Sequence, residues 1–158
     1  MKSGLLLFVL TFSLFSLVHV TDVLAQRLNV DKQNLAIEGY DPVAYQSQNK
    51  AVKGKASITA KYEGAVYWFE NTRHKALFEA NPAKYAPAYG GWCAFAMGDY
   101  GEKVEIDPET FKVIDGKTYL FYNKYFTNTL VSWNKNEAKL KKQADINWQR
   151  FEQGHLLK

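Results

Sequence analysis

Residues 85–95 read Tyr-Ala-Pro-Ala-Tyr-Gly-Gly-Trp-Cys-Ala-Phe and combine features that occur nowhere else in the chain. The stretch holds the single cysteine, Cys93, and the only adjacent glycine pair, Gly90-Gly91. Glycine allows positive φ angles and lets the backbone approach another group closely. We therefore predict a tight turn, flanked by aromatic side chains, that holds Cys93 in a fixed position.

The N-terminal 25 residues have the pattern of a secretory signal peptide. Lys2 provides a short positive region, residues 5–20 are mostly apolar, and Val23-Leu24-Ala25 is a small-residue cleavage signal. The apolar run is short and interrupted compared with the roughly 20 residues of a membrane-spanning helix. We predict a chain that is cleaved before Gln26, is exported to the periplasm or secreted, and is not stably inserted in a membrane.

Charge and cysteine content limit the possible partners. The net charge is +4, and the basic residues are spread along the chain except for a local run at Lys139, Lys141 and Lys142. Such a run is typical of a solvated helix face, so we expect no nucleic-acid partner. Cys93 cannot form an internal disulfide, which leaves burial, metal ligation, reactivity or an intermolecular bridge.

Two β-hairpins are predicted from turn pairs that separate apolar runs. Gly64 and Gly116 each follow an acidic residue at such a turn, and Asp-Gly is among the strongest hairpin signals. The predicted strand pairs are residues 58–62 with 65–69, and residues 111–114 with 117–122.

Helices are predicted from capping residues and apolar spacing. Asp41 can cap a short turn opened by Pro42, and Asn71 can cap a helix whose Ala76-Leu77-Phe78 stripe would face the core. Residues 92–97 fit either a buried strand or a helical turn. A final helix is indicated by one apolar face: Leu140, Ala144, Trp148 and Phe151.

Strands and helices do not alternate regularly, so we predict an α+β fold. The expected fold is a small single domain with two β-hairpins packed against short helices and a longer C-terminal helix. Its predicted parts are a signal peptide (1–25), a polar lead-in (26–34), the domain itself (35–152) and a C-terminal tail (153–158).

Taken together, these segments resemble the YHS-domain proteins, in particular the small secreted ones of the TRASH-like superfamily. The resemblance covers nearly all of the chain after the signal peptide. The matching residues are, in order, Gly39 to Tyr45; Tyr62, Gly64, Tyr67 and Phe69; Arg73 and Phe78; Asn81, Pro82, Lys84, Tyr85, Pro87, Tyr89, Gly90, Gly91, Cys93 and Ala94; Asp107 and Pro108; Asp115, Gly116, Lys117, Tyr119 and Leu120; and Trp133, Ala144 and Trp148.

The resemblance implies binding of a heavy metal, copper first and zinc second, through the Cys93 thiolate. A soft thiolate suits Cu(I) or Zn(II). Further ligands could come from His74, and from the soft thioether of Met97, which would share a face with Cys93 in a helix. The expected partner is a metal ion or a metal-handling protein. This chain lacks the several cysteines of TRASH-type metal sites.

Two other interpretations remain open. The first is a structural or small-ligand-binding module in which Cys93 is buried and inert; the aromatics that could line its pocket are Tyr40, Tyr45, Tyr67, Tyr85, Tyr89 and Trp92. The second, less favoured, is a cysteine-dependent enzyme that pairs Cys93 with His74 and with Asp107 or Asp115. The chain has no strained nucleophile motif.

Overall fold

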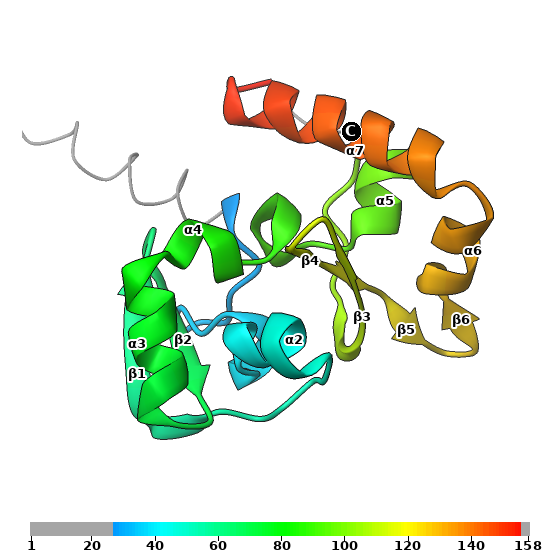
Figure 1. Ribbon diagram of the computed structural model, residues 1–158. Helices are drawn as coiled ribbons and strands as arrows, with labels where there is room; N and C mark the ends of the chain where they lie inside the picture. The colour runs from blue at the N-terminus through cyan, green and yellow to red at the C-terminus, as the bar shows by residue number, and fades with distance from the viewer. Residues whose placement is uncertain (1–26, 156–158) are drawn as a thin grey trace, which may run out of the picture.

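The computed structural model describes residues 27–155, so the predicted signal peptide lies outside the described residues. The described part is a mixed α+β domain with three antiparallel sheets of two strands each and a long C-terminal helix (Figure 1). This confirms the predicted fold class. Within residues 27–155, no helix is long and apolar enough to cross a membrane.

The first half of the domain is built on the first predicted hairpin. Strands β1 (Lys55–Tyr62) and β2 (Ala65–Phe69) pair across Glu63-Gly64, and both turn residues have positive φ angles. Three short helices and one 3-10 turn surround the hairpin; they are η1 (Ile37–Gly39), α2 (Pro42–Gln48), α3 (Thr72–Ala80) and α4 (Pro82–Tyr85).

The caps of these helices lie where the sequence predicts them. The Asp41 carboxylate accepts hydrogen bonds from the Val43 and Ala44 N–H groups at the start of α2, and Asn71 accepts one from His74 N–H in α3. The predicted core stripe of α3 is wrong for Ala76 and Leu77, which are exposed. The buried face contains His74 and Phe78 instead, because residues four apart lie on one side of a helix.

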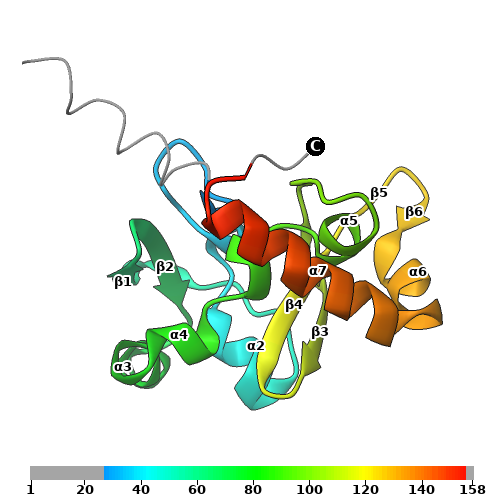
Figure 2. The same ribbon diagram turned by 90° about the horizontal axis from the view of Figure 1, so that it is seen from above.

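The second half is built on the second hairpin, β3 (Asp107–Ile114) and β4 (Lys117–Phe121), which pair across Asp115-Gly116. The remaining elements of this half are η2 (Ala88–Gly91), α5 (Ala94–Asp99), β5 (Asn123–Lys124), β6 (Thr127–Asn128), α6 (Thr129–Lys135) and α7 (Glu137–Glu152). Residues 92–97 therefore lead into a helix rather than a strand. Seen from above, α7 crosses over β4 (Figure 2).

The short hairpin of β5 and β6 has an unusual turn. Its two turn residues, Tyr125 and Phe126, have φ angles of 51° and 65°, and both side chains are exposed. Two-residue turns of this kind normally contain Asn-Gly or Asp-Gly, because bulky residues are strained at positive φ. The sequence carries no turn signal here, which is why this hairpin was not predicted.

The predicted lead-in lies against the glycine pair. The Asn29 N–H donates to the Gly90 carbonyl (2.8 Å), and the Asn29 side chain donates to the Gly91 carbonyl (3.2 Å). A β-carbon on Gly90 would lie 2.3 Å from the Arg27 carbonyl oxygen, so this approach requires glycine. Residues 27–34 thus belong to the folded body of the domain.

The buried side chains form two groups. The first group extends from β1, β2 and α3 into the second half and includes Phe69, Phe78 and Cys93. The second lies between β4, α5, α6 and α7 and is centred on Trp133. The face of α7 that carries Leu140, Ala144 and Trp148 packs on this second group, as the spacing predicts.

Candidate functional site

Cys93 is fully buried and lies immediately before α5. Its N–H donates to the Val104 carbonyl (2.9 Å), and its sulfur accepts the backbone N–H of Tyr122 (3.3 Å). The Thr129 hydroxyl lies 3.5 Å from the same sulfur. A thiol enclosed in this way behaves as a small buried group rather than as an accessible nucleophile or ligand.

Met97 is also fully buried, one helical turn after Cys93. Its side chain belongs to the second buried group, together with Trp133 and Leu140. Its carbonyl oxygen accepts a hydrogen bond from the Asn147 side chain of α7 (2.7 Å). These contacts give Met97 a packing role between α5 and α7.

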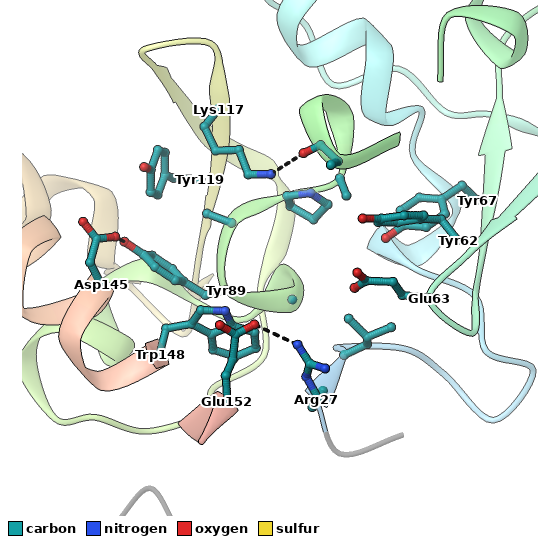
Figure 3. Close-up of a pocket in the computed structure, with 16 residues that line it drawn as sticks. Arg27, Tyr62, Glu63, Tyr67, Tyr89, Lys117, Tyr119, Asp145, Trp148 and Glu152 are labelled. Carbon is teal, nitrogen blue, oxygen red and sulfur yellow. Dashed lines mark hydrogen bonds and ion pairs between the residues drawn. The ribbon is translucent and has the colours of Figure 1, made fainter. Parts of the chain in front are cut away.

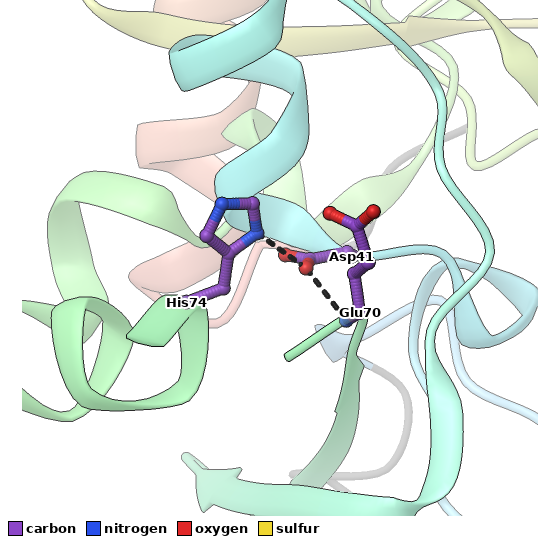
Figure 4. Close-up of side chains that lie close together, drawn as sticks. All are labelled: Asp41, Glu70 and His74. Carbon is purple, nitrogen blue, oxygen red and sulfur yellow. Dashed lines mark hydrogen bonds and ion pairs between the residues drawn. The ribbon is translucent and has the colours of Figure 1, made fainter. Parts of the chain in front are cut away.

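His74 is 7% exposed and pairs with a buried carboxylate. Its Nδ1 lies 2.7 Å from Asp41 Oδ2 (Figure 4). An ionised carboxylate can only accept hydrogen bonds, so Nδ1 carries a hydrogen and donates a hydrogen bond to Asp41. This fixes the ring orientation and leaves Nε2 without a hydrogen-bond partner among residues 27–155.

The predicted ligand set of Cys93, His74 and Met97 is not assembled in the described residues. Helix α3, which carries His74, and helix α5, which follows Cys93 and contains Met97, lie toward opposite sides of the domain in both views (Figures 1 and 2). The hydrogen bonds of Cys93 and His74 also go to different partners. Three residues so placed do not form one coordination sphere.

The aspartates of the enzyme alternative have local roles. Asp107 accepts hydrogen bonds from the Glu109 N–H (3.0 Å) and from the Thr110 hydroxyl (2.8 Å). Asp115 occupies the positive-φ position of its hairpin turn. Neither aspartate orients His74, whose partner is Asp41. The described contacts therefore contain no Cys-His-Asp arrangement of the kind that nucleophilic catalysis uses.

A cluster that the sequence did not suggest lies around His74. Asp41, Glu70 and His74 each place a ligand atom so that all three lie within 4.8 Å of one another. Asp41 Oδ2 also accepts the backbone N–H of Glu70 (2.8 Å), which joins the end of β2 to the start of α2. The one available signal for this cluster is that His74 shares the buried face of α3 with Phe78.

A pocket of about 330 Å³ lies between the two halves (Figure 3). The β1–β2 hairpin lines one side, β4 and α7 line the other, and residues 86–90 lie between them. The charged and aromatic side chains that line it are Arg27, Tyr62, Glu63, Tyr67, Tyr89, Lys117, Tyr119, Asp145, Trp148 and Glu152. Natural small-molecule pockets have volumes of about 300–1,000 Å³, so the volume of this half-open pocket lies at the lower end of that range.

Some of the aromatic residues that the sequence suggested for a ligand pocket line this pocket, and others lie in the core or at the surface. Tyr67 and Tyr89 line the pocket. Tyr45 is fully buried and donates its hydroxyl hydrogen to the Pro108 carbonyl (2.8 Å), and Tyr85 packs in the first buried group. Tyr40 donates to Glu109 at the surface (2.9 Å). Tyr67 and Tyr89 therefore line the pocket, whereas the other tyrosine candidates make contacts elsewhere in the fold.

The Trp92 indole N–H donates to the Arg27 carbonyl (3.2 Å), which helps fix the chain at the pocket edge. Lys117 is one of the residues that match the YHS pattern, where it has no predicted binding role; in the structure Lys117 lines the pocket. Lys117 directly follows the Asp-Gly turn, and this position in the sequence predicts a hairpin residue rather than a pocket residue.

Comparison of the chain with protein-family models, with curated proteins and with solved structures found no match.

Proposed function

We propose that this chain is an exported YHS-like binding protein that holds one small organic molecule in the pocket between its two halves. The signal-peptide pattern supports export, and the sequence resemblance supports the YHS assignment. The enclosed position of Cys93 favours the small-ligand interpretation over a thiolate metal site.

The observation that carries this proposal is the Tyr67 hydroxyl. Tyr67 is 3% exposed, its hydroxyl points into the pocket (Figure 3), and it has no hydrogen-bond partner among the described residues. The hydroxyl oxygen is open to the pocket rather than enclosed in the core, because the fully buried side-chain atom without a partner among the described residues is Gln46 Oε1. A bound molecule would take the place of solvent at this hydroxyl, and burial raises the pKa of Tyr67, so the hydroxyl remains protonated and can donate.

The proposal predicts that filling the pocket abolishes ligand binding. The chain from Gln26 onward is mixed with small aromatic and aliphatic acids, alcohols and amines, and the Tm of each mixture is measured by thermal unfolding. A ligand at ten times its Kd stabilises by about 1.4 kcal/mol, which raises Tm by several degrees. Ala83→Phe, an exposed position on the pocket lining, should remove that shift.

The matched control is Ala56→Phe, which places the same side chain on an exposed position of β1 that is not among the pocket-lining residues. It should leave the Tm shift intact. Absence of any stabilising compound, or equal shifts in Ala83→Phe and the unmodified chain, would show that the pocket is not a ligand site.

A second candidate is a metal site at Asp41, Glu70 and His74. The observation that favours it is the 4.8 Å grouping of one imidazole and two carboxylates. The ring nitrogen that faces Asp41 is Nδ1, so a metal ion held by all three groups would replace the hydrogen on that nitrogen. Nitrogen and oxygen donors suit Zn(II) or Cu(II) rather than Cu(I), which prefers sulfur.

Calorimetric titration with Zn(II) tests this second candidate. We expect binding that His74→Ala weakens at least about tenfold, as loss of a zinc ligand or its support does. The exposed His155→Ala variant should bind as the unmodified chain does. If Cys93→Ser weakens binding and His74→Ala does not, the thiolate site predicted from the sequence is the correct one instead.

A further inference from the structure

Two carboxylates of the pocket, Asp145 and Glu152, already have hydrogen-bond donors. Asp145 accepts from the Tyr89 hydroxyl (2.8 Å) and from Lys141 (3.0 Å). Glu152 accepts from Arg27 (2.7 Å), which neutralises the one arginine of the pocket. Burial and, after it, the neighbouring Glu63 raise the pKa of Tyr62. Asp145 and Glu152 therefore already have donors within the chain.

Two donors, in contrast, are incompletely used. Lys117 donates to the Ala83 carbonyl (2.7 Å), which leaves two of the three ammonium hydrogens. Tyr67 has no partner among residues 27–155. The pocket of the folded chain thus offers an excess of hydrogen-bond donors, one of them charged.

The surroundings of Lys117 make that charge costly. Burial lowers the pKa of Lys117, and the facing Glu63 carboxylate opposes this effect only from a distance, through its charge. Figure 3 shows Lys117 and Glu63 on opposite sides of the pocket. A partly desolvated ammonium group gains most from an anion placed in direct contact.

We infer that the ligand carries a carboxylate or a similar acceptor-rich anionic group, which accepts hydrogen bonds from Lys117 and Tyr67. This inference rests on the proposed function. Residues Ala86, Pro87 and Ala88 supply apolar surface between the two halves, and the rings of Tyr89 and Trp148 border the same space. The ligand class is therefore a small monoanionic acid with an apolar body.

Three probes of nearly equal size separate charge from shape: 3-phenylpropanoate, 3-phenylpropan-1-ol and 3-phenylpropan-1-amine. Their dissociation constants are measured by NMR titration of the folded chain from Gln26 onward. The acid should bind at least about tenfold more tightly than the alcohol, because a charge-assisted hydrogen bond contributes that much. The amine should bind most weakly.

Lys117→Met should reduce the preference for the acid over the alcohol to about twofold or less, and Tyr67→Phe should reduce it about fivefold. The control Lys124→Met removes one positive charge from an exposed position that is not among the pocket-lining residues and should keep the full preference. NMR spectra verify that each variant is folded.

The outcomes separate this inference from the proposed function. If the alcohol or amine binds as tightly as the acid and Ala83→Phe abolishes that binding, the anionic ligand is wrong but the pocket remains a ligand site. An acid preference that survives Lys117→Met would also overturn the inference. If no probe binds, or if Ala83→Phe leaves binding unchanged, the proposed function fails as well.

Discussion

Asp41→Ala is expected to lower the free energy of unfolding by about 3–5 kcal/mol, because it removes the acceptor of several buried hydrogen bonds. The carboxylate is fully buried and joins three segments. One oxygen caps α2 through Val43 and Ala44, and the other accepts from the Glu70 N–H and from His74. Without it, these buried donors would lose their acceptor.

Urea unfolding of Asp41→Ala beside Asp31→Ala measures this effect. Asp31 is the matched control, since its carboxylate also accepts two backbone N–H groups, those of Gln33 and Leu35, but at an exposed position. Loss of those exposed turn hydrogen bonds should cost about 1 kcal/mol. Equal losses in the two variants would show that burial and the His74 pair add nothing to the cap.

Trp133→Ala is expected to cost about 3–5 kcal/mol, since it leaves a cavity at the centre of the second buried group. Trp133 is fully buried, and its ring lies 5.4 Å from that of Phe121 and 6.0 Å from that of Tyr119, between centroids. Its indole N–H donates to Glu137 (3.0 Å), at the start of α7. A hydrogen bond from Lys112 is the main cause that lowers the pKa of Glu137.

Trp133→Phe separates the two contributions, because it keeps an aromatic ring and removes the indole N–H. We expect it to cost about half as much as Trp133→Ala, partly through the lost hydrogen bond. Thermal and urea unfolding measure both variants. A loss below about 1 kcal/mol for Trp133→Ala would mean that the second group repacks without this side chain.

Local signals in the sequence were sufficient for most of the secondary structure. The Glu63-Gly64 and Asp115-Gly116 turns, the caps at Asp41 and Asn71, and the apolar face of α7 all lie where the pattern placed them. Each depends on φ angles, capping or spacing within a few residues, which the sequence states directly. The Tyr125-Phe126 turn was missed because neither residue favours positive φ.

The candidate sites depended on contacts between distant residues. Asp41 and His74 are 33 positions apart, and the Tyr122 N–H that bonds the Cys93 sulfur is 29 positions from it. The pocket draws on segments from Arg27 to Glu152. No local pattern encodes such distances, because they follow from how the two halves pack.

The sequence by itself thus determined the α+β class, both main hairpins and the final helix, since these arise from interactions between near neighbours in the chain. It also identified Cys93, His74 and Met97 as chemically notable residues. Only the tertiary structure decided that Cys93 and Met97 are enclosed, that His74 pairs with Asp41, and that Tyr67 and Lys117 face one pocket. Burial and convergence are properties of packed surfaces, which spacing alone does not specify.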